Sequence, residues 1–153
     1  MLKEILILFL ITLVPFVELR GSIPYGISVL GLNWFIVFLI AVISNALIGP
    51  LIYFLLDKLI HNFLLKNKWF SNIYNKIIER TQRKIKKYVN KYGEIGIAIF
   101  IAVPLPGTGS YSAALGSYLI GLNFKKFIIA NLIGVLIAGI IVTLITIGIK
   151  NLF

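Results

Sequence analysis

The chain has 153 residues, 59% of them hydrophobic, and a formal net charge of +10. Its mean hydropathy of +1.01 excludes a soluble domain of this length, which could not bury so much apolar surface, and indicates a compact polytopic membrane protein. Ten of the fifteen basic residues lie between Lys58 and Lys91, apart from the apolar segments. The charge therefore favours a membrane surface rather than nucleic acid as the partner.

Few residues could perform catalysis or hold a metal ion. The chain contains no cysteine, one histidine and five acidic residues. These residues are His61, Glu4, Glu18, Asp57, Glu79 and Glu94. Because this set is too sparse for a metal site or for a nucleophile with its general base, we expect no enzyme activity, no metal and no cofactor.

The first part of the chain predicts a short helical hairpin followed by a full membrane span. Residues 5–17 are apolar, but a helix of that length covers only about 20 Å of a hydrocarbon core about 30 Å thick. The sequence ELRGSIP (residues 18–24, the first interruption) breaks the apolar pattern, and the next apolar run, residues 23–31, is again short. From Trp34 to Leu56 the chain is apolar for 23 residues, which is long enough to cross a bilayer with some tilt.

Residues 57–93 have a different pattern. Apolar residues recur at helical spacing with lysines and arginines between them, which predicts one or two basic amphipathic helices in the membrane interface. The third part of the chain then repeats the first. It has a short apolar run (95–103), the sequence PLPGTGSYS (104–112, the second interruption), another short run (113–122) and an apolar stretch of 23 residues (127–149).

The two halves align without gaps when the chain is shifted by 90 residues. The most specific match places Gly-Leu-Asn-Trp (31–34) on Gly-Leu-Asn-Phe (121–124). We therefore predict an all-α polytopic membrane protein built as an inverted repeat, each copy having one re-entrant helical hairpin and one transmembrane helix. Within this single membrane domain, repeat 1 covers 4–56, the basic amphipathic linker covers 57–93 and repeat 2 covers 94–150.

One net crossing per repeat places the two copies in opposite orientations. The positive-inside rule puts the basic linker in the cytoplasm and both termini outside. Lys125 and Lys126 then also face the cytoplasm, whereas their repeat counterparts Phe35 and Ile36 face outside without charge. The alternative of four or more plain spans would place the charges of the first interruption in a lipid-exposed helix, at a high free-energy cost. We expect no cleavable signal peptide, because the first apolar run lacks a small-residue cleavage site.

The two interruptions would meet near the membrane midplane, and we predict the binding site there. Arg20 would bind an anion, Glu18 would take up a proton, and helix N-termini would offer backbone N–H groups. Alternatively, Glu18 and Arg20 form a structural pair that ties one hairpin tip to the other. We expect Arg20 to contact the backbone of residues 107–109, and the prolines to fix the turns. The candidate substrate- or ion-binding residues are Glu18, Arg20, Gly21, Ser22, Pro24, Pro104, Pro106, Gly107, Thr108, Gly109, Ser110 and Ser112.

Other polar residues lie inside or near the predicted spans. Asn45 and Asn131 would either line the transport path or join two helices by hydrogen bonds. Glu4 and Glu94 are expected at helix N-termini, where the helix dipole favours a negative charge.

The motifs ELRGSIP and PLPGTGSYS resemble the paired signatures of the putative small multidrug export protein family of small prokaryotic membrane proteins. This resemblance covers essentially the whole chain and implies export of drug-like compounds. The layout also distantly resembles the DedA/SNARE-associated (VTT) superfamily, which implies proton-coupled handling of lipid phosphates. Glu18 and Arg20 are similar to the acidic residue and the arginine in the broken loops of that superfamily, but the second interruption here lacks the arginine that those loops carry.

These observations predict a secondary transporter or flippase in the prokaryotic plasma membrane, with proton coupling as an option. Its substrate would be an amphipathic or anionic molecule, either a drug-like compound or a lipid phosphate. Its other partners would be membrane lipids and a second copy in a homodimer, with no nucleic acid. The alternative function is a non-transporting membrane scaffold or assembly factor that binds a partner through the basic linker.

Overall fold

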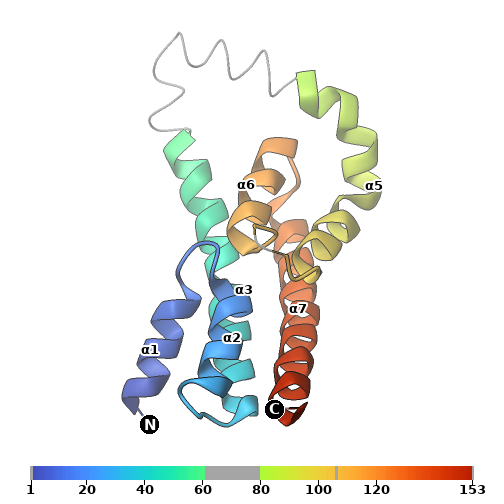
Figure 1. The fold of residues 1–153 in the computed structure, drawn as a ribbon. Helices are drawn as coiled ribbons and strands as arrows, with labels where there is room; N and C mark the ends of the chain where they lie inside the picture. The colour runs from blue at the N-terminus through green and yellow to red at the C-terminus, as the bar shows by residue number, and fades with distance from the viewer. Residues whose placement is uncertain (1, 61–79, 106, 153) are drawn as a thin grey trace.

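The structure, a computed structural model, describes residues 2–60, 80–105 and 107–152, with the backbone alone at residues 80–90 and 151. All regular secondary structure in these residues is helical (Figure 1). The helices are α1 (Leu2–Thr12), α2 (Glu18–Ser28), α3 (Trp34–Leu59), α5 (Arg80–Ala102), α6 (Ser110–Ile120) and α7 (Phe124–Leu152). The predicted all-α class is confirmed, and α3 and α7 are long and apolar enough to cross a membrane.

Two helical hairpins pack against the pair of long helices. Helices α1 and α2 form one hairpin, in which α1 packs on α3 and α2 on both α3 and α7. Helices α5 and α6 form the other, in which α5 packs on α7 and α6 chiefly on α3. The chain termini lie at one end of the molecule, near the open end of the α1–α2 hairpin, whereas α5 and α6 extend from the opposite end (Figure 1). The turns of the two hairpins therefore approach each other in the middle of the molecule.

Both hairpins lead into their long helix through the same local structure. Gly31 and Gly121 adopt φ angles of +64° and +75°, which glycine reaches without the steric cost of a side chain. Two residues later, the side chains of Asn33 and Asn123 each accept a hydrogen bond of 2.9 Å from the backbone N–H two positions further on. These asparagines cap the N-termini of α3 and α7 and so set where each long helix begins.

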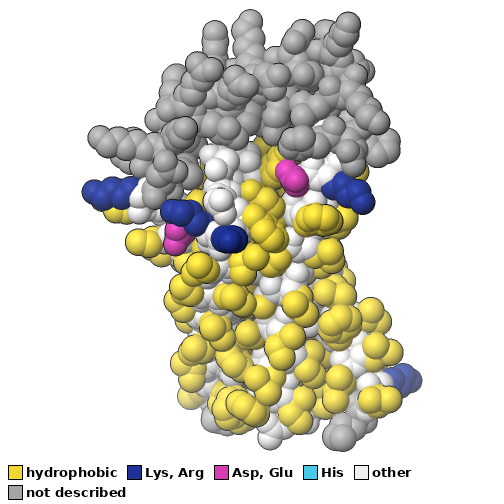
Figure 2. All heavy atoms as spheres, turned by 180° about the vertical axis from the view of Figure 1, so that it is seen from behind, with side chains coloured by type: hydrophobic (Ala, Val, Ile, Leu, Met, Phe, Trp, Pro, Cys, Tyr) yellow, Lys and Arg dark blue, Asp and Glu magenta, His cyan; other side chains and the backbone are white. Residues whose placement is uncertain are grey.

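The interior is formed mainly by α2, α3, α6 and α7. Ile23, Ala41, Ala114 and Phe127, one from each of these helices, are fully buried. The outer surface is also apolar, because large side chains such as Leu47 and Leu144 are about two-thirds exposed, at 66% and 65%. Figure 2 shows hydrophobic side chains over the middle of one face, with the charged side chains toward its two ends. Such a belt suits contact with lipid.

The first interruption is helical rather than a turn, which corrects the prediction. Residues 18–24 begin α2, and the turn lies at residues 13–17. Pro15 explains this shift, because a proline disfavours helical geometry at the residue before it. Pro24 was expected to fix a turn and this was wrong, since it lies inside α2.

Helix α5 also differs from expectation. It runs without a break from Arg80 to Ala102, so the end of the predicted linker and the first arm of the second hairpin are one helix. Glu94 therefore does not lie at a helix N-terminus, and that prediction was wrong. Its carboxylate instead forms an ion pair of 2.8 Å with Lys126 of α7. Glu4 does lie in the first turn of its helix, α1. The predicted linker also began too early, because Asp57 to Leu59 belong to α3, and its residues 61–79 lie outside the described residues.

Candidate functional site

The backbone at the end of the first turn directs the Glu18 carboxylate toward the interior. Phe16 and Glu18 have φ angles of +70° and +46°, a region that costs residues other than glycine roughly 1–2 kcal/mol each. Glu18 is only 2% exposed, although it is the first residue of α2. Surrounding contacts must therefore hold both the unusual backbone and the buried charge in place.

One group of contacts comes from the N-terminus of α6. The Glu18 carboxylate accepts hydrogen bonds from the backbone N–H groups of Ser110, at 3.1 Å, and Tyr111, at 3.3 Å. The N-cap residue of α6 is Gly109, which has no side chain to make such bonds. A methyl group on Gly109 would overlap the Glu18 carboxylate. The acidic side chain of one hairpin thus caps the helix of the other, where the helix dipole favours negative charge.

Arg20 provides the second group of contacts. Its Nη1 donates to Glu18 Oε2 at 2.9 Å, and the exposed fractions of the two side chains are 11% and 3%. Its Nη2 donates to Ile101 O at 3.0 Å and to Thr108 O and Oγ1 at 3.1 and 3.0 Å. The expected contact between Arg20 and the backbone of the second turn is therefore present. The guanidinium joins the carboxylate to the C-terminal end of α5, where carbonyl groups attract a cation.

A small cavity lies beside this ion pair. Its volume is about 40 Å³, which is room for a water molecule but not for a substrate. The cavity is lined by Pro15, Phe16, Glu18, Arg20, Gly107, Gly109, Tyr111 and Ser112. Tyr111 also closes the gap between the turns, because its hydroxyl donates to Leu13 O at 2.5 Å.

The structure brings together only some of the candidate residues. Glu18, Arg20, Gly107, Gly109 and Ser112 line the cavity, and Thr108 and Ser110 contact the ion pair directly. Gly21, Ser22 and Pro24 lie in α2 and do not line the cavity, Pro104 lies in the second turn, and Pro106 lies outside the described residues.

Two buried hydroxyl groups stand out near the site. Ser22 and Ser110 are both fully buried, and within the described part of the chain neither Oγ atom has a hydrogen-bond partner. Buried polar groups usually have a partner, which can be an ordered water.

Three residues that line the cavity are not among the predicted candidates: Pro15, Phe16 and Tyr111. Pro15 and Phe16 were read as part of an apolar arm, although they form the turn and line the cavity. The only sequence signal for this turn was the proline within the apolar run.

Comparison with known proteins supports a family assignment. No curated protein and no solved structure matches the chain. Residues 18–141, more than half of the chain, match the family described as "Putative small multi-drug export protein". The matched range begins at Glu18 and contains both the Glu18–Arg20 pair and the second turn. The chain therefore belongs to the putative small multi-drug export protein family.

Proposed function

We propose that the protein is a secondary transporter or flippase of the prokaryotic plasma membrane that moves an amphipathic anion, either a drug-like compound or a lipid phosphate. One observation carries this proposal: the Glu18 carboxylate occupies the backbone N–H groups at the N-terminus of α6, with Arg20 beside it. Helix N-termini and arginine are the groups with which proteins commonly bind phosphate and carboxylate. In this structure the Glu18 carboxylate would thus occupy the position at which a substrate anion binds.

In this proposal α3 and α7 cross the membrane and the two hairpins are re-entrant. Helices α1, α2 and α6 have 11 residues each, so each covers about 16 Å, roughly half of the hydrocarbon core. The basic linker would be cytoplasmic and both termini outside, because the positive-inside rule favours that orientation.

Matching local structure supports an inverted repeat. The glycine and asparagine that begin each long helix are 90 positions apart and have the same conformation and capping role. Two apolar grooves also correspond, one between α1 and α3 and the other between α5 and α7. The first is lined by Ile5, Phe9, Ile40 and Ile43, and the second by their counterparts at the 90-residue offset, Ile95, Ile99, Ala130 and Ile133.

Proton coupling follows from competition between Glu18 and the substrate. An ionised Glu18 neutralises Arg20 and occupies the α6 N–H groups, so a second anion would face both repulsion and a lack of donors. A protonated Glu18 carries no negative charge, which frees Arg20 and the N–H groups for the substrate anion. Arrival of the anion then restores the charge balance that a buried arginine requires. Uptake of one proton would accompany binding of one anionic charge.

The expected partners are membrane lipids and a second copy of the chain. Lipids would cover the apolar belt. A homodimer would complete the transport pathway, because the cavity beside the ion pair of a single copy has a volume of only about 40 Å³. Transport of this kind needs no catalytic step, metal or cofactor. The distant resemblance to the DedA/SNARE-associated superfamily rests on layout and on Glu18 and Arg20.

A second candidate function is a membrane scaffold without transport. It is favoured by the number of backbone carbonyls that Arg20 binds across the two hairpins, which would give the ion pair a structural role. Under this alternative, neutralising Glu18 would affect stability and nothing else.

Proteoliposomes that contain a pH-sensitive dye distinguish these functions. The substrate probe is a fluorescent polyprenyl phosphate, and a cationic drug is tested in parallel. We expect the phosphate to cross with a proton flux in the wild type, and Glu18→Gln to lose that flux. The matched control is Glu94→Gln, which also removes one carboxylate but lies outside the site. Melting temperatures establish that both variants are folded. If the polyprenyl phosphate does not cross, or if folded Glu18→Gln behaves like Glu94→Gln, the proposal of an anion transporter is wrong.

A further inference from the structure

Three hydrogen-bond donors beside the ion pair have no acceptor among the described residues. They are Arg20 Nε and the hydroxyls of Ser22 and Ser110, and all three atoms are buried. A buried donor without a partner costs free energy, so most such donors in folded proteins have one. The hydroxyls of Thr12 and Thr146, for example, each donate to the carbonyl four residues earlier, at 2.7 Å. Three unpartnered donors around one ion pair point to a ligand that accepts hydrogen bonds.

Both serine side chains lean toward the turn that carries Glu18. In an α-helix each Cα–Cβ bond tilts toward the N-terminus of the helix. Ser110 is the first residue of α6, so its side chain leans toward the helix end that the Glu18 carboxylate caps. Ser22 lies one turn after Glu18 on the same face of α2, so its side chain leans back toward that turn. Both residues are fully buried.

The Glu18 carboxylate has too few acceptor sites for all of these donors. Its two oxygens already accept hydrogen bonds from the N–H groups of Ser110 and Tyr111 and from Arg20 Nη1. A carboxylate offers about four lone-pair sites, so it could accept at most one of the three remaining donors. A phosphate or sulfate ester has three free oxygens and about six lone-pair sites. Such a group could accept hydrogen bonds from all six donors at once.

We propose that Ser22, Ser110 and the Nε atom of Arg20 are further ligands of the substrate anion, and that they select a phosphate or sulfate ester over a carboxylate. This inference rests on the proposed function, because Glu18 must leave the N-terminus of α6 when the substrate binds. Helix N-termini and the arginine fork both suit tetrahedral oxyanions. The cavity of about 40 Å³ beside the ion pair gives room for a group larger than the Glu18 carboxylate.

Rescue of a Glu18→Gly variant by small anions tests this selection. Glycine accommodates the φ angle of +46° at this position, and its lack of a carboxylate opens the α6 N–H groups to an anion. Methyl phosphate and acetate are compared at about pH 5.5, where each carries close to one negative charge. The melting temperature of the full-length protein in nanodiscs is the readout. Methyl phosphate should act at a concentration about fivefold lower than acetate, although acetate is the closer replacement for the lost carboxylate.

Serine variants in the Glu18→Gly background assign the preference to the hydroxyls. Ser110→Ala and Ser22→Ala should each raise the half-maximal concentration of methyl phosphate about fivefold and leave that of acetate unchanged. Ser117→Ala is the matched control and should change neither concentration. Ser117 is equally buried and also has no partner among the described residues, but it lies two turns further along α6. The wild type in the same solutions corrects for general salt effects.

Dodecyl phosphate and dodecanoate, which enter from the bilayer, extend the comparison to amphipathic anions. The same preference for the phosphate is expected. A preference limited to the two soluble anions would assign the site to free phosphate and overturn the selection of an amphipathic ester.

Three further results would overturn the proposed selection. They are a rescue by acetate that equals the rescue by methyl phosphate, no rescue by methyl phosphate, and a Ser117→Ala variant that behaves like Ser110→Ala. If Glu18→Gly is unfolded without an anion, the folded fraction replaces the melting temperature as the readout. Loss of the preference with intact transport of the polyprenyl phosphate rejects the selection alone. Absence of transport with an intact preference rejects the transporter and retains the binding site.

Discussion

The carboxylate of Glu18 accepts a hydrogen bond of 3.1 Å from the backbone N–H of Ser110, a residue 92 positions later in the chain. This contact places the acidic residue of one hairpin at the N-terminus of a helix in the other. Because Gly109 cannot cap that helix itself, α6 depends on Glu18 for its first hydrogen-bond acceptor. The two hairpins are thus joined by charge and backbone hydrogen bonds as well as by apolar packing.

Gly109→Ala should displace the Glu18 carboxylate, because the added methyl group would overlap it. We expect the free energy of unfolding to fall by about 2–4 kcal/mol, since a buried carboxylate loses its donors. Denaturant titration in detergent measures this change. Gly116→Ala in the same helix is the matched control, because a methyl group there meets nothing within 4 Å and should be neutral or slightly stabilising. Equal effects of the two variants would show that Gly109 has no special role.

Arg20→Ala should lower the free energy of unfolding by about 3–5 kcal/mol, because it leaves Glu18 as an unpaired buried charge. Free guanidinium at millimolar concentration should partly restore the melting temperature of this variant but not change that of the wild type. The free guanidinium ion would occupy the place of the Arg20 side-chain group, where Nη1 contacts the Glu18 carboxylate and Nη2 contacts the Thr108 carbonyl of the second turn. Arg20→Lys should be intermediate, since an ammonium group lacks the planar fork. Identical responses of wild type and Arg20→Ala to guanidinium would contradict this account.

Asn131 should compensate for Pro50 in α3. Pro50 has no N–H for the carbonyl of Ala46, four residues earlier, and Asn131 Nδ2 of α7 donates to that carbonyl at 3.3 Å. Asn131→Ala should therefore destabilise the protein by about 1–3 kcal/mol. The loss should be smaller by about 1 kcal/mol in a Pro50→Ala background, where the backbone N–H of residue 50 can bond to Ala46. A double-mutant cycle from melting data measures this coupling, and strictly additive effects would refute it.

Single-cysteine labelling tests the proposed topology, and the chain suits it because it contains no native cysteine. Leu2, Leu59 and Leu152 are exposed, at 85%, 52% and 80%, and lie near the ends of α1, α3 and α7. A membrane-impermeant maleimide should label Leu2→Cys and Leu152→Cys in intact cells, and Leu59→Cys only after permeabilisation. Labelling of Leu2→Cys and Leu152→Cys from opposite sides of the membrane would be incompatible with one net crossing per repeat.

Several features of the structure could be predicted from the sequence, because they depend on properties of a single segment of the chain. The long apolar runs that begin near Trp34 and Phe127 predicted α3 and α7, since span length and composition need no information about neighbours. The repeated Gly-Leu-Asn predicted a shared feature at both positions, and the left-handed glycine and the asparagine cap are local backbone chemistry. The pairing of Glu18 with Arg20 was also predictable as one of two alternatives, because a charge in an apolar segment needs compensation.

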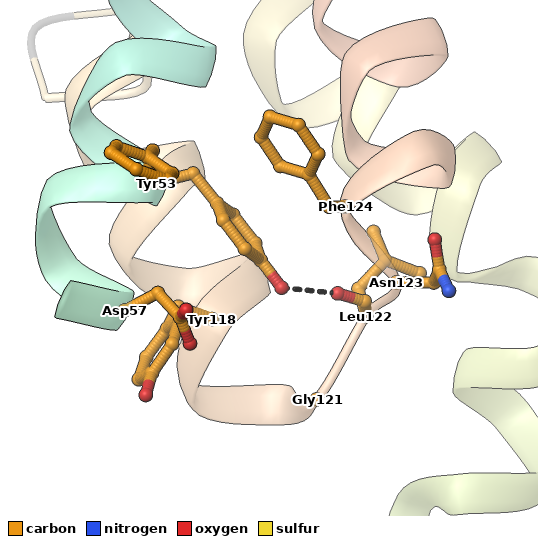
Figure 3. Close-up of a pocket in the computed structure, with 8 residues that line it drawn as sticks. Tyr53, Asp57, Tyr118, Gly121, Leu122, Asn123 and Phe124 are labelled. Carbon is orange, nitrogen blue, oxygen red and sulfur yellow. Dashed lines mark hydrogen bonds between the residues drawn. The ribbon is translucent and has the colours of Figure 1, made fainter. Parts of the chain in front are cut away.

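Other features were decided by the tertiary structure. The sequence alone put the first turn at residues 18–24, whereas the turn lies at 13–17 and Glu18 begins a helix with a positive φ. That conformation is costly by itself, and what offsets it lies in the other hairpin, at the N-terminus of α6. A pocket of about 490 Å³ likewise joins side chains of α3, among them Tyr53 and Phe54, with the α6–α7 turn (Figure 3). Length, apolarity and charge pattern act within one segment and can be read along the chain, but contacts between segments about 90 residues apart exist only once both hairpins are folded together.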